Sequence, residues 1–214
     1  MKKFAWLIAL LCAFSIHTSW ASAQLDDSIK NLQHAWAKAN YKTPEAEQEA
    51  AFKALSEQAH QVSAANPGRA EPLIWEAIIL SGYAKAKGGL GALKLAEQAR
   101  DLLLMAEKIN PLALDGSAYT TLGSLYYKVP RWPLGFGDKK KARAYLEKAL
   151  QINPNGIDPN YFYADFLLDQ GEYAKAAEYF RKALSAAPRP GREDADEGRR
   201  ADIRAGLQQA EKKS

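Results

Sequence analysis

The sequence is poor in the residues on which catalysis most often depends. Its one cysteine, Cys12, lies in an apolar N-terminal run, and only two of its three histidines, His34 and His60, come after residue 23. Two histidines without a clear set of carboxylates do not make a metal site, so we expect both to be ordinary helix residues. The stretch Gly88–Gly91 lacks the Lys-Ser/Thr pair and the preceding strand of a phosphate-binding loop. We therefore expect no enzyme, no cofactor and no bound metal.

A strong excess of charge of one sign is also lacking. The chain has 29 Lys and Arg against 25 Asp and Glu, which gives a formal net charge of +4. Nucleic-acid-binding domains usually carry a strong basic stripe, so this balance argues against a nucleic-acid partner. No Gly-, Ser- or Pro-rich linker divides the sequence, which favours one continuous domain over two globules.

The N-terminus predicts export. Lys2-Lys3, the apolar run Phe4–Ile16 and the small residues Ala21-Ser22-Ala23 are typical of a cleaved signal peptide over residues 1–23. A retained membrane anchor is the alternative, but the run is shorter than the ~20 residues that span a bilayer. The bulky residue directly before Cys12 argues against lipoprotein processing. We expect a periplasmic protein that starts at Gln24, has no membrane span and, without its two N-terminal lysines, has a net charge of +2.

One segment, Ile157–Pro188, shows how the cysteine-free mature chain is organised. Asp158-Pro159 is typical of a helix start with Asp158 as the capping residue, Gly171 ends that helix, and a second helix runs up to Pro188. A helical hairpin of this size cannot bury its apolar stripe alone, so we expect stacked copies of it. Prolines close the copies at intervals of 44, 43 and 34 residues, at positions Pro67, Pro111, Pro154 and Pro188.

Similar signals place the other helices. We expect them over residues 25–41, from a cap at Thr43 to Ala65, from Pro72 onward, over 92–109 after a flexible glycine turn, over 117–128, and from a cap at Asp138 to Asn153. The second helix of each pair carries apolar residues at 3-and-4 spacing, which predicts its buried face: Leu55, Ala59 and Val62; Ala99, Leu102, Leu103 and Ala106; Ala142, Tyr145, Leu146, Ala149 and Leu150; Ala176, Tyr179, Phe180, Ala183 and Leu184. The alanines indicate that neighbouring helices cross closely.

These repeats resemble the tetratricopeptide repeat family. The residues that carry the resemblance are Tyr119, Leu122, Gly123, Tyr126, Ala142, Leu146, Ala149 and Pro154 in the third pair, and Gly171, Tyr173, Ala176, Phe180, Ala183 and Pro188 in the fourth. In the fourth pair, Ala164 and Tyr163 replace the usual glycine and leucine. The resemblance implies an all-α solenoid of about four helical hairpins over residues 24–191. Residues 192–214 would form a capping helix or tail.

The charges of the C-terminal tail can be interpreted in two ways. Acidic and basic residues alternate around a thin apolar stripe of Ala195, Ile203 and Leu207. This pattern favours a polar capping helix whose charges face water. The alternative is an anion site formed by the clustered Arg199, Arg200 and Arg204.

Binding is the function that the repeats predict. Stacked hairpins curve, and their first helices line the concave face. By family positions, that face presents Trp75, Ile79, Tyr83, Thr120, Ser124, Tyr127, Lys128, Tyr161, Asp165 and Asp169. Aromatic side chains are the usual anchors of interfaces, although any one of these residues could pack between helices instead. Because Lys128 is the one base, a C-terminal carboxylate fits poorly, and we expect a protein or peptide partner with basic or apolar groups.

The loop Val129–Gly137 is the clearest departure from an ordinary repeat. Its large apolar residues Trp132 and Phe136 either form a contact site or fold back onto the adjacent helices. With the Gly-Asp-Lys-Lys-Lys-Ala that overlaps its end, the loop resembles the periplasmic T component of some TRAP solute transporters. That resemblance implies an alternative function: an accessory component that forms a homo-oligomer and binds a small apolar ligand.

Overall fold

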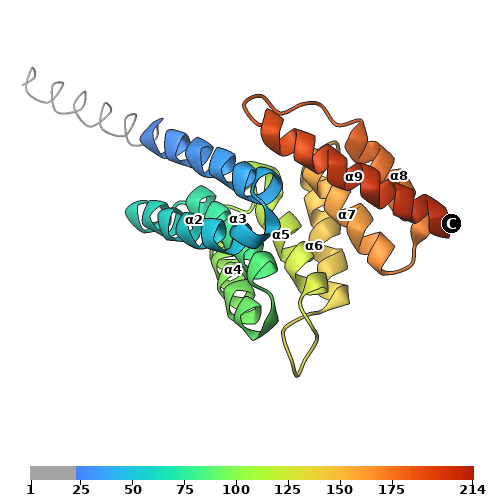
Figure 1. The fold of residues 1–214 in the computed structure, drawn as a ribbon, viewed down its shortest axis with the longest axis horizontal. Helices are drawn as coiled ribbons and strands as arrows, with labels where there is room; N and C mark the ends of the chain where they lie inside the picture. The colour runs from blue at the N-terminus through green and yellow to red at the C-terminus, as the bar shows by residue number, and fades with distance from the viewer. Residues whose placement is uncertain (1–22) are drawn as a thin grey trace, which may run out of the picture.

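The computed structural model describes residues 23–214, and these lie almost entirely in helices (Figure 1). The predicted signal peptide lies outside this range apart from Ala23. The elements are a helix over residues 23–37, η1 (Lys38–Lys42), α2 (Glu45–Ala65), α3 (Ala70–Lys87), α4 (Gly89–Ile109), η2 (Ala113–Gly116), α5 (Ser117–Lys128), α6 (Lys139–Ile152), α7 (Ile157–Asp169), α8 (Tyr173–Leu184) and α9 (Glu193–Lys213). Within residues 23–214, no helix combines the length and the apolar character that crossing a bilayer requires.

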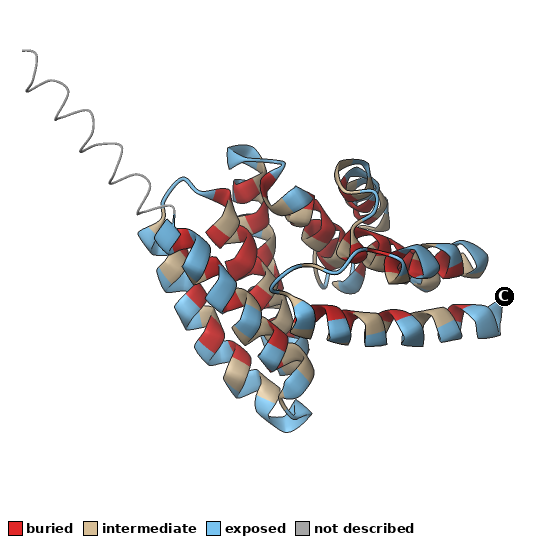
Figure 2. Ribbon diagram, turned by 90° about the horizontal axis from the view of Figure 1, so that it is seen from above, coloured by how far each residue is buried: buried red, intermediate tan, exposed pale blue. Residues whose placement is uncertain are grey.

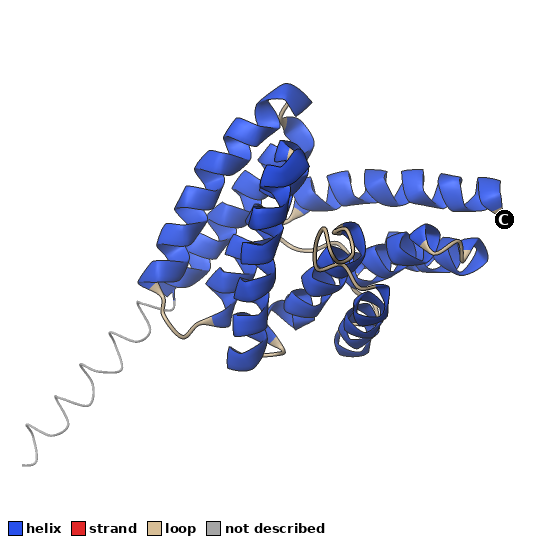
Figure 3. Ribbon diagram, turned by 90° about the horizontal axis from the view of Figure 1, so that it is seen from below, coloured by secondary structure: helices blue, strands red, loops and turns tan. Residues whose placement is uncertain are grey.

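Helices that follow one another in the chain pair as hairpins. Helix α3 packs on α4, α5 on α6 and α7 on α8, while α2 lies against α3. The first helices of the last three hairpins, α3, α5 and α7, are neighbours in that order, and α9 contacts α7 next in the series. We call these four helices the inner row. Figure 3 shows most helices joined by short connections, and the connections between α5 and α6 and between α8 and α9 are longer. The predicted all-α stack of hairpins with a final capping helix is confirmed.

The buried faces follow the predicted spacing. Figure 2 shows buried residues as stripes along the helices where they face their neighbours. In the second helices, the residues that are fully buried (0% exposed) are Ala59, Ala99, Leu103, Ala106, Ala142, Leu146, Ala149, Ala176, Phe180 and Ala183. Close crossing also explains Gly123 on α5, because an added Cβ would lie only 2.5 Å from Leu146 Cγ on α6. Size matching between paired helices therefore sets the hairpin geometry.

The signals at helix ends are partly confirmed. The Asp138 carboxylate caps α6 by accepting from the backbone N–H groups of Lys140 and Lys141, at 2.9 and 3.0 Å. Gly171 has φ +77, a left-handed conformation that suits glycine at the α7–α8 turn.

Four predicted helix starts are wrong by a few residues. Thr43 does not cap α2, because its hydroxyl donates to the carbonyl oxygen of Lys38 instead (3.1 Å). Helix α3 begins before Pro72, and α4 follows the single residue Gly88 rather than starting at position 92. Gly156, rather than Asp158, occupies the capping position of α7.

Candidate functional site

The structure spreads the ten predicted concave-face residues along the inner row at different depths. Trp75, Ile79, Thr120 and Tyr127 are buried, Tyr83, Ser124, Tyr161 and Asp165 are partly buried, and Lys128 and Asp169 are exposed. The row therefore does not present all ten side chains to solvent. Its exposed part lies where α5 and α7 end and includes Lys128 and Asp169. We call this part the rim.

At this rim, polar contacts link neighbouring hairpins. Tyr127 Oη donates to Asp165 Oδ2 at 2.5 Å, and Lys128 Nζ lies 2.8 Å from the same oxygen. Burial raises the pKa of Tyr127 well above its usual range, and the negative charge of Asp165 raises it further. Lys139, at the start of α6, pairs with Asp169 at 3.1 Å. Asp165 is thus already held by two partners, and Asp169 is the more accessible carboxylate.

On α3, the predicted residues belong to the core of the first hairpin. Trp75 makes an edge contact with Trp36, with ring centroids 6.3 Å apart, and Ile79 is fully buried in the same cluster. The Arg192 guanidinium lies 5.1 Å from the Trp75 ring centroid, so the start of the tail covers this part of the row. Trp75 and Ile79 therefore pack between helices, which is one of the two interpretations that the sequence left open.

At the other end of α7, the Asp158 carboxylate lies between two arginines. Arg189 Nη1 donates to Asp158 Oδ2 at 2.6 Å, and Arg199 Nε donates to Oδ1 at 2.8 Å. Burial raises the pKa of Asp158, but the positive charges of Arg189 and Arg199 outweigh it and hold that pKa well below its usual range. Arg189 also bonds the buried Asp196 at 2.7 Å. Asp158 is therefore the centre of an ion-pair cluster, which its predicted capping role missed.

Arg199 and Arg200 of α9 fit neither interpretation of the sequence, which were charges that face water and an anion site. Arg199 is only 7% exposed, so the expectation that its charge faces water is wrong. Arg200 donates to the carbonyl oxygens of Leu184 and Ala186, at 2.5 and 2.7 Å, beyond the end of α8. These two guanidinium groups are occupied within the chain, and neither is left for an anion site.

Helix α9 also reaches back to the first hairpin. Tyr41 Oη donates to Asp202 at 3.1 Å, and Lys42 pairs with Asp194 at 2.7 Å. A Cβ on Gly198 would lie 2.3 Å from the Tyr41 ring, so the two helices touch closely at this point. We call these contacts between η1 and α9 the clasp. The capping helix thus covers α7 and α8 and also joins the last helix to the first hairpin.

The loop Val129–Gly137 separates its two large aromatic residues. Phe136 folds back, with its ring centroid 5.7 Å from that of Tyr126 and 4.6 Å from the Arg100 guanidinium. Trp132 is 86% exposed. Each of the two interpretations of this loop therefore holds for one residue: Phe136 packs onto the helices, and Trp132 is free to make a contact.

The two histidines lie on the surface of the first hairpin. His34 is exposed, and His60 Nδ1 lies 3.0 Å from the Glu76 carboxylate, which also accepts from the hydroxyl of Ser63. Among residues 23–214, no group of three His, Cys, Asp or Glu side chains is arranged to hold a metal ion.

Comparison with known proteins places the repeat signature in the second half of the chain. Residues 134–195, which span α6 to α8, match the family model described as tetratricopeptide repeat. TTC0263, a thermophilic TPR protein in Thermus thermophilus, is 19% identical with a TM-score of 0.43, over 74% of this chain and 92% of that one. MamA AMB-1 is 19% identical with a TM-score of 0.46, over 88% and 95%. PilF of Pseudomonas aeruginosa is 17% identical with a TM-score of 0.36, over 89% and 90%. A search of curated proteins gives no match. Residues 134–195 thus match the tetratricopeptide repeat, and they lie within an all-α stack of helical hairpins.

Proposed function

We propose that this chain is a non-catalytic periplasmic scaffold that binds a protein or peptide at the rim where α5 and α7 end. Tetratricopeptide repeats generally form protein-interaction scaffolds, and residues 134–195 carry that repeat. The rim joins consecutive hairpins, so a partner seated there contacts more than one repeat.

The observation that carries the proposal is a pair of solvent-accessible ion pairs across the rim. The side chains of Lys128 and Asp165 are 56% and 21% exposed, and those of Lys139 and Asp169 are 40% and 43% exposed. Surface ion pairs contribute only about 0–1 kcal/mol each, so a partner can exchange them for its own charges at small cost. A partner with basic groups facing Asp169 fits this arrangement. The buried Trp75 and Ile79 stabilise the fold and would make no direct contact with the partner.

Site-specific photo-crosslinking tests the rim. A crosslinker at Lys128 or Asp169 should give a discrete adduct in cells, and Lys139→Ala should change its yield because Lys139 competes for Asp169. The matched control is Lys175, which also sits in an exposed ion pair, with Glu172 at 3.0 Å, on α8 outside the inner row. Adducts of equal yield and size from positions 128, 169 and 175 would contradict the proposal.

The periplasmic location rests on the signal-peptide pattern of residues 1–23. Mass spectrometry of the protein purified from cells that express the full chain should find Gln24 as the first residue, in the periplasmic fraction. A protein that retains Met1, or that is recovered with the cytoplasm, contradicts this part of the proposal.

The alternative, an accessory component of a TRAP-type transporter, needs a site for a small apolar ligand. Of two hollows on the described surface, one is lined mainly by Arg131, Asp138, Lys139 and Lys140, and the other largely by amide and hydroxyl side chains such as Gln24, Asn31 and Gln58. Both hollows are open to solvent, and neither is an enclosed apolar cavity of the kind that a small apolar ligand would need, which favours the scaffold. Native mass spectrometry decides between the two, because a small molecule retained by the purified protein would support the accessory role.

A further inference from the structure

One edge of the stack carries three exposed large apolar side chains. The turns that join the first helix of each hairpin to its second must all lie on the same edge, because the hairpins stack in parallel. Leu90, just after the α3–α4 turn, is 95% exposed, and Trp132 and Leu134, in the α5–α6 loop, are 86% and 73% exposed. We call these three residues the apolar tip. The two segments meet, since a Cβ on Gly135 would lie 3.3 Å from Leu93 Cδ1, one turn after Leu90.

The loop that carries Trp132 and Leu134 is firmly braced. The N–H groups of Leu134 and Gly135 donate to the carbonyl of Arg131, at 3.1 and 3.2 Å, and Gly137 N–H donates to Pro130 at 2.9 Å. A Cβ on Gly137 would lie 2.0 Å from the carbonyl oxygen of Val129, so the two sides of the loop are in contact. With Phe136 packed on Tyr126, the loop cannot turn Trp132 inward without losing these bonds. It projects from the body of the molecule (Figure 1).

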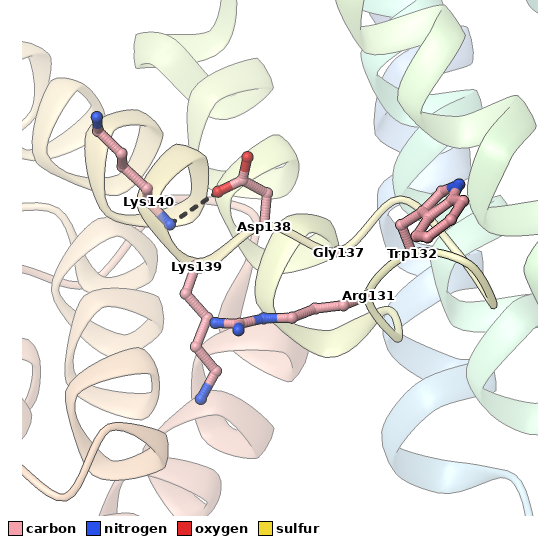
Figure 4. Close-up of a pocket in the computed structure, with 6 residues that line it drawn as sticks. All are labelled: Arg131, Trp132, Gly137, Asp138, Lys139 and Lys140. Atoms are coloured by element: carbon pink, nitrogen blue, oxygen red, sulfur yellow. Dashed lines mark hydrogen bonds between the residues drawn. The ribbon is translucent and has the colours of Figure 1, made fainter.

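Basic side chains lie on one side of the loop that carries Trp132 and Leu134. Arg131, Lys139 and Lys140 line, together with Trp132, a hollow of ≈ 430 Å³. In Figure 4, Arg131 and Lys139 lie to one side of the loop, while the Asp138 oxygen faces the start of α6, where the carboxylate serves as the helix cap. Lys139 pairs with Asp169, whereas Arg131 and Lys140 form no salt bridge within residues 23–214. The tip therefore has cations available beside its apolar side chains.

We propose that the apolar tip docks on an anionic lipid surface. Trp and Leu side chains enter the boundary between headgroups and acyl chains, while Lys and Arg bind lipid phosphates. The surplus of unpaired cations selects a negatively charged surface. A projecting tip suits a membrane, which needs no preformed pocket to receive it, better than it suits a protein partner. The apolar tip differs from the rim at which we place the partner, and Lys139 borders both, so the scaffold would hold its partner beside a membrane.

Vesicle co-sedimentation tests the proposal with protein purified from cells that express the full chain. Vesicles of phosphatidylglycerol and phosphatidylcholine should bind the protein, and vesicles of phosphatidylcholine alone should bind it much less. Trp132→Ala with Leu134→Ala should lower the partition coefficient about tenfold or more, since each removes apolar area from the bilayer contact. Arg131→Glu with Lys140→Glu should lower it similarly and reduce its dependence on salt.

Matched controls separate docking from general stickiness. Leu112→Ala removes another exposed leucine, 63% exposed, from the α4–α5 connection on the opposite edge. Lys53→Glu with Arg204→Glu makes the same change of net charge at exposed positions on α2 and α9. Both controls should bind vesicles like the parent protein. Because the N-terminal segment is the same in every variant, it does not contribute to the differences.

Trp132 also gives a direct signal. Its emission should shift to the blue on anionic vesicles and be quenched by brominated acyl chains, and Trp132→Phe should remove most of this signal while vesicle binding remains. Equal binding by the parent and by the Trp132–Leu134 double variant overturns the proposal. Equal binding to neutral and anionic vesicles also overturns it, as does capture of an acidic protein without any binding to vesicles. Each of these results leaves the crosslinking test of the rim unaffected.

Discussion

The two ends of α7 place carboxylates in opposite surroundings. Asp158, near its start, is enclosed by Arg189 and Arg199, while Asp169, at its end, forms an exposed pair with Lys139. The buried cluster joins the last hairpin to α9, which reaches the first hairpin through the clasp. The exposed pair of Lys139 and Asp169 can open without disturbing the ion-pair cluster around Asp158 or the clasp. The comparison indicates that one end of the helix stabilises the stack and the other is free to bind.

The largest expected effect comes from the buried end. Asp158→Asn leaves Arg189 and Arg199 beside a neutral side chain, and losing one member of a buried ion pair costs about 3–5 kcal/mol. Because the Asp158 side chain keeps 30% of its exposure, water screens part of this loss. We expect a fall of about 2–3 kcal/mol in the free energy of unfolding, measured by urea titration. Ordinary surface substitutions change the free energy of unfolding by less than about 0.5 kcal/mol. A loss in that range for Asp158→Asn would contradict the difference that we draw between the two ends of α7.

The same carboxylate predicts how stability depends on pH. The pKa of Asp158 is lowered in the folded state, so the unfolded chain takes up this proton first as the pH falls. The contribution is complete above the unfolded pKa of about 3.9 and is lost progressively below it. Melting temperatures of the parent and Asp158→Asn should therefore differ by a constant amount from pH 7 down to about 5 and converge below about 4. A difference that grows on acidification would contradict the assignment.

The clasp should give an intermediate effect. Gly198→Ala places a methyl group against the Tyr41 ring, and overpacking of this kind costs about 1–3 kcal/mol, partly offset by the ~1 kcal/mol helix preference of alanine. We expect a net loss of about 1 kcal/mol, with faster amide exchange in η1 and the first turns of α9.

Gly91→Ala on α4 is the matched control for this change. There the new methyl group would meet only the flexible end of the Lys87 side chain. This variant should be as stable as the parent or slightly more so. Unchanged exchange in η1 of the Gly198→Ala protein would show that the clasp does not hold the two hairpins together.

The contrast between the two ends of α7 also shows which features the sequence could predict and which it could not. The positions of Leu146 and Phe180 repeat at a fixed distance from the closing prolines, so periodicity alone predicted the buried faces of the second helices. The partners of Asp158 lie 31 and 41 residues away, and nothing local reveals them. Asp158 therefore looked like a helix cap, which is the commonest role of Asp before Pro at a helix start. Trp132 and Phe136 looked equivalent for a similar reason: the hydrogen bonds of the loop, rather than composition, decide which one faces solvent.

The smallest expected effect is at the exposed end. Asp169→Asn removes a pair whose side chains are 40% and 43% exposed, and such pairs contribute about 0–1 kcal/mol, so urea titration should show a change within about 0.5 kcal/mol. Amide exchange in α7 should also stay the same, because no buried group loses a partner. If Asp169→Asn instead destabilised the protein as much as Asp158→Asn, the rim would be part of the structural framework. A partner could not then displace Lys139 at low cost, so a neutral result here is what the binding role of this end requires.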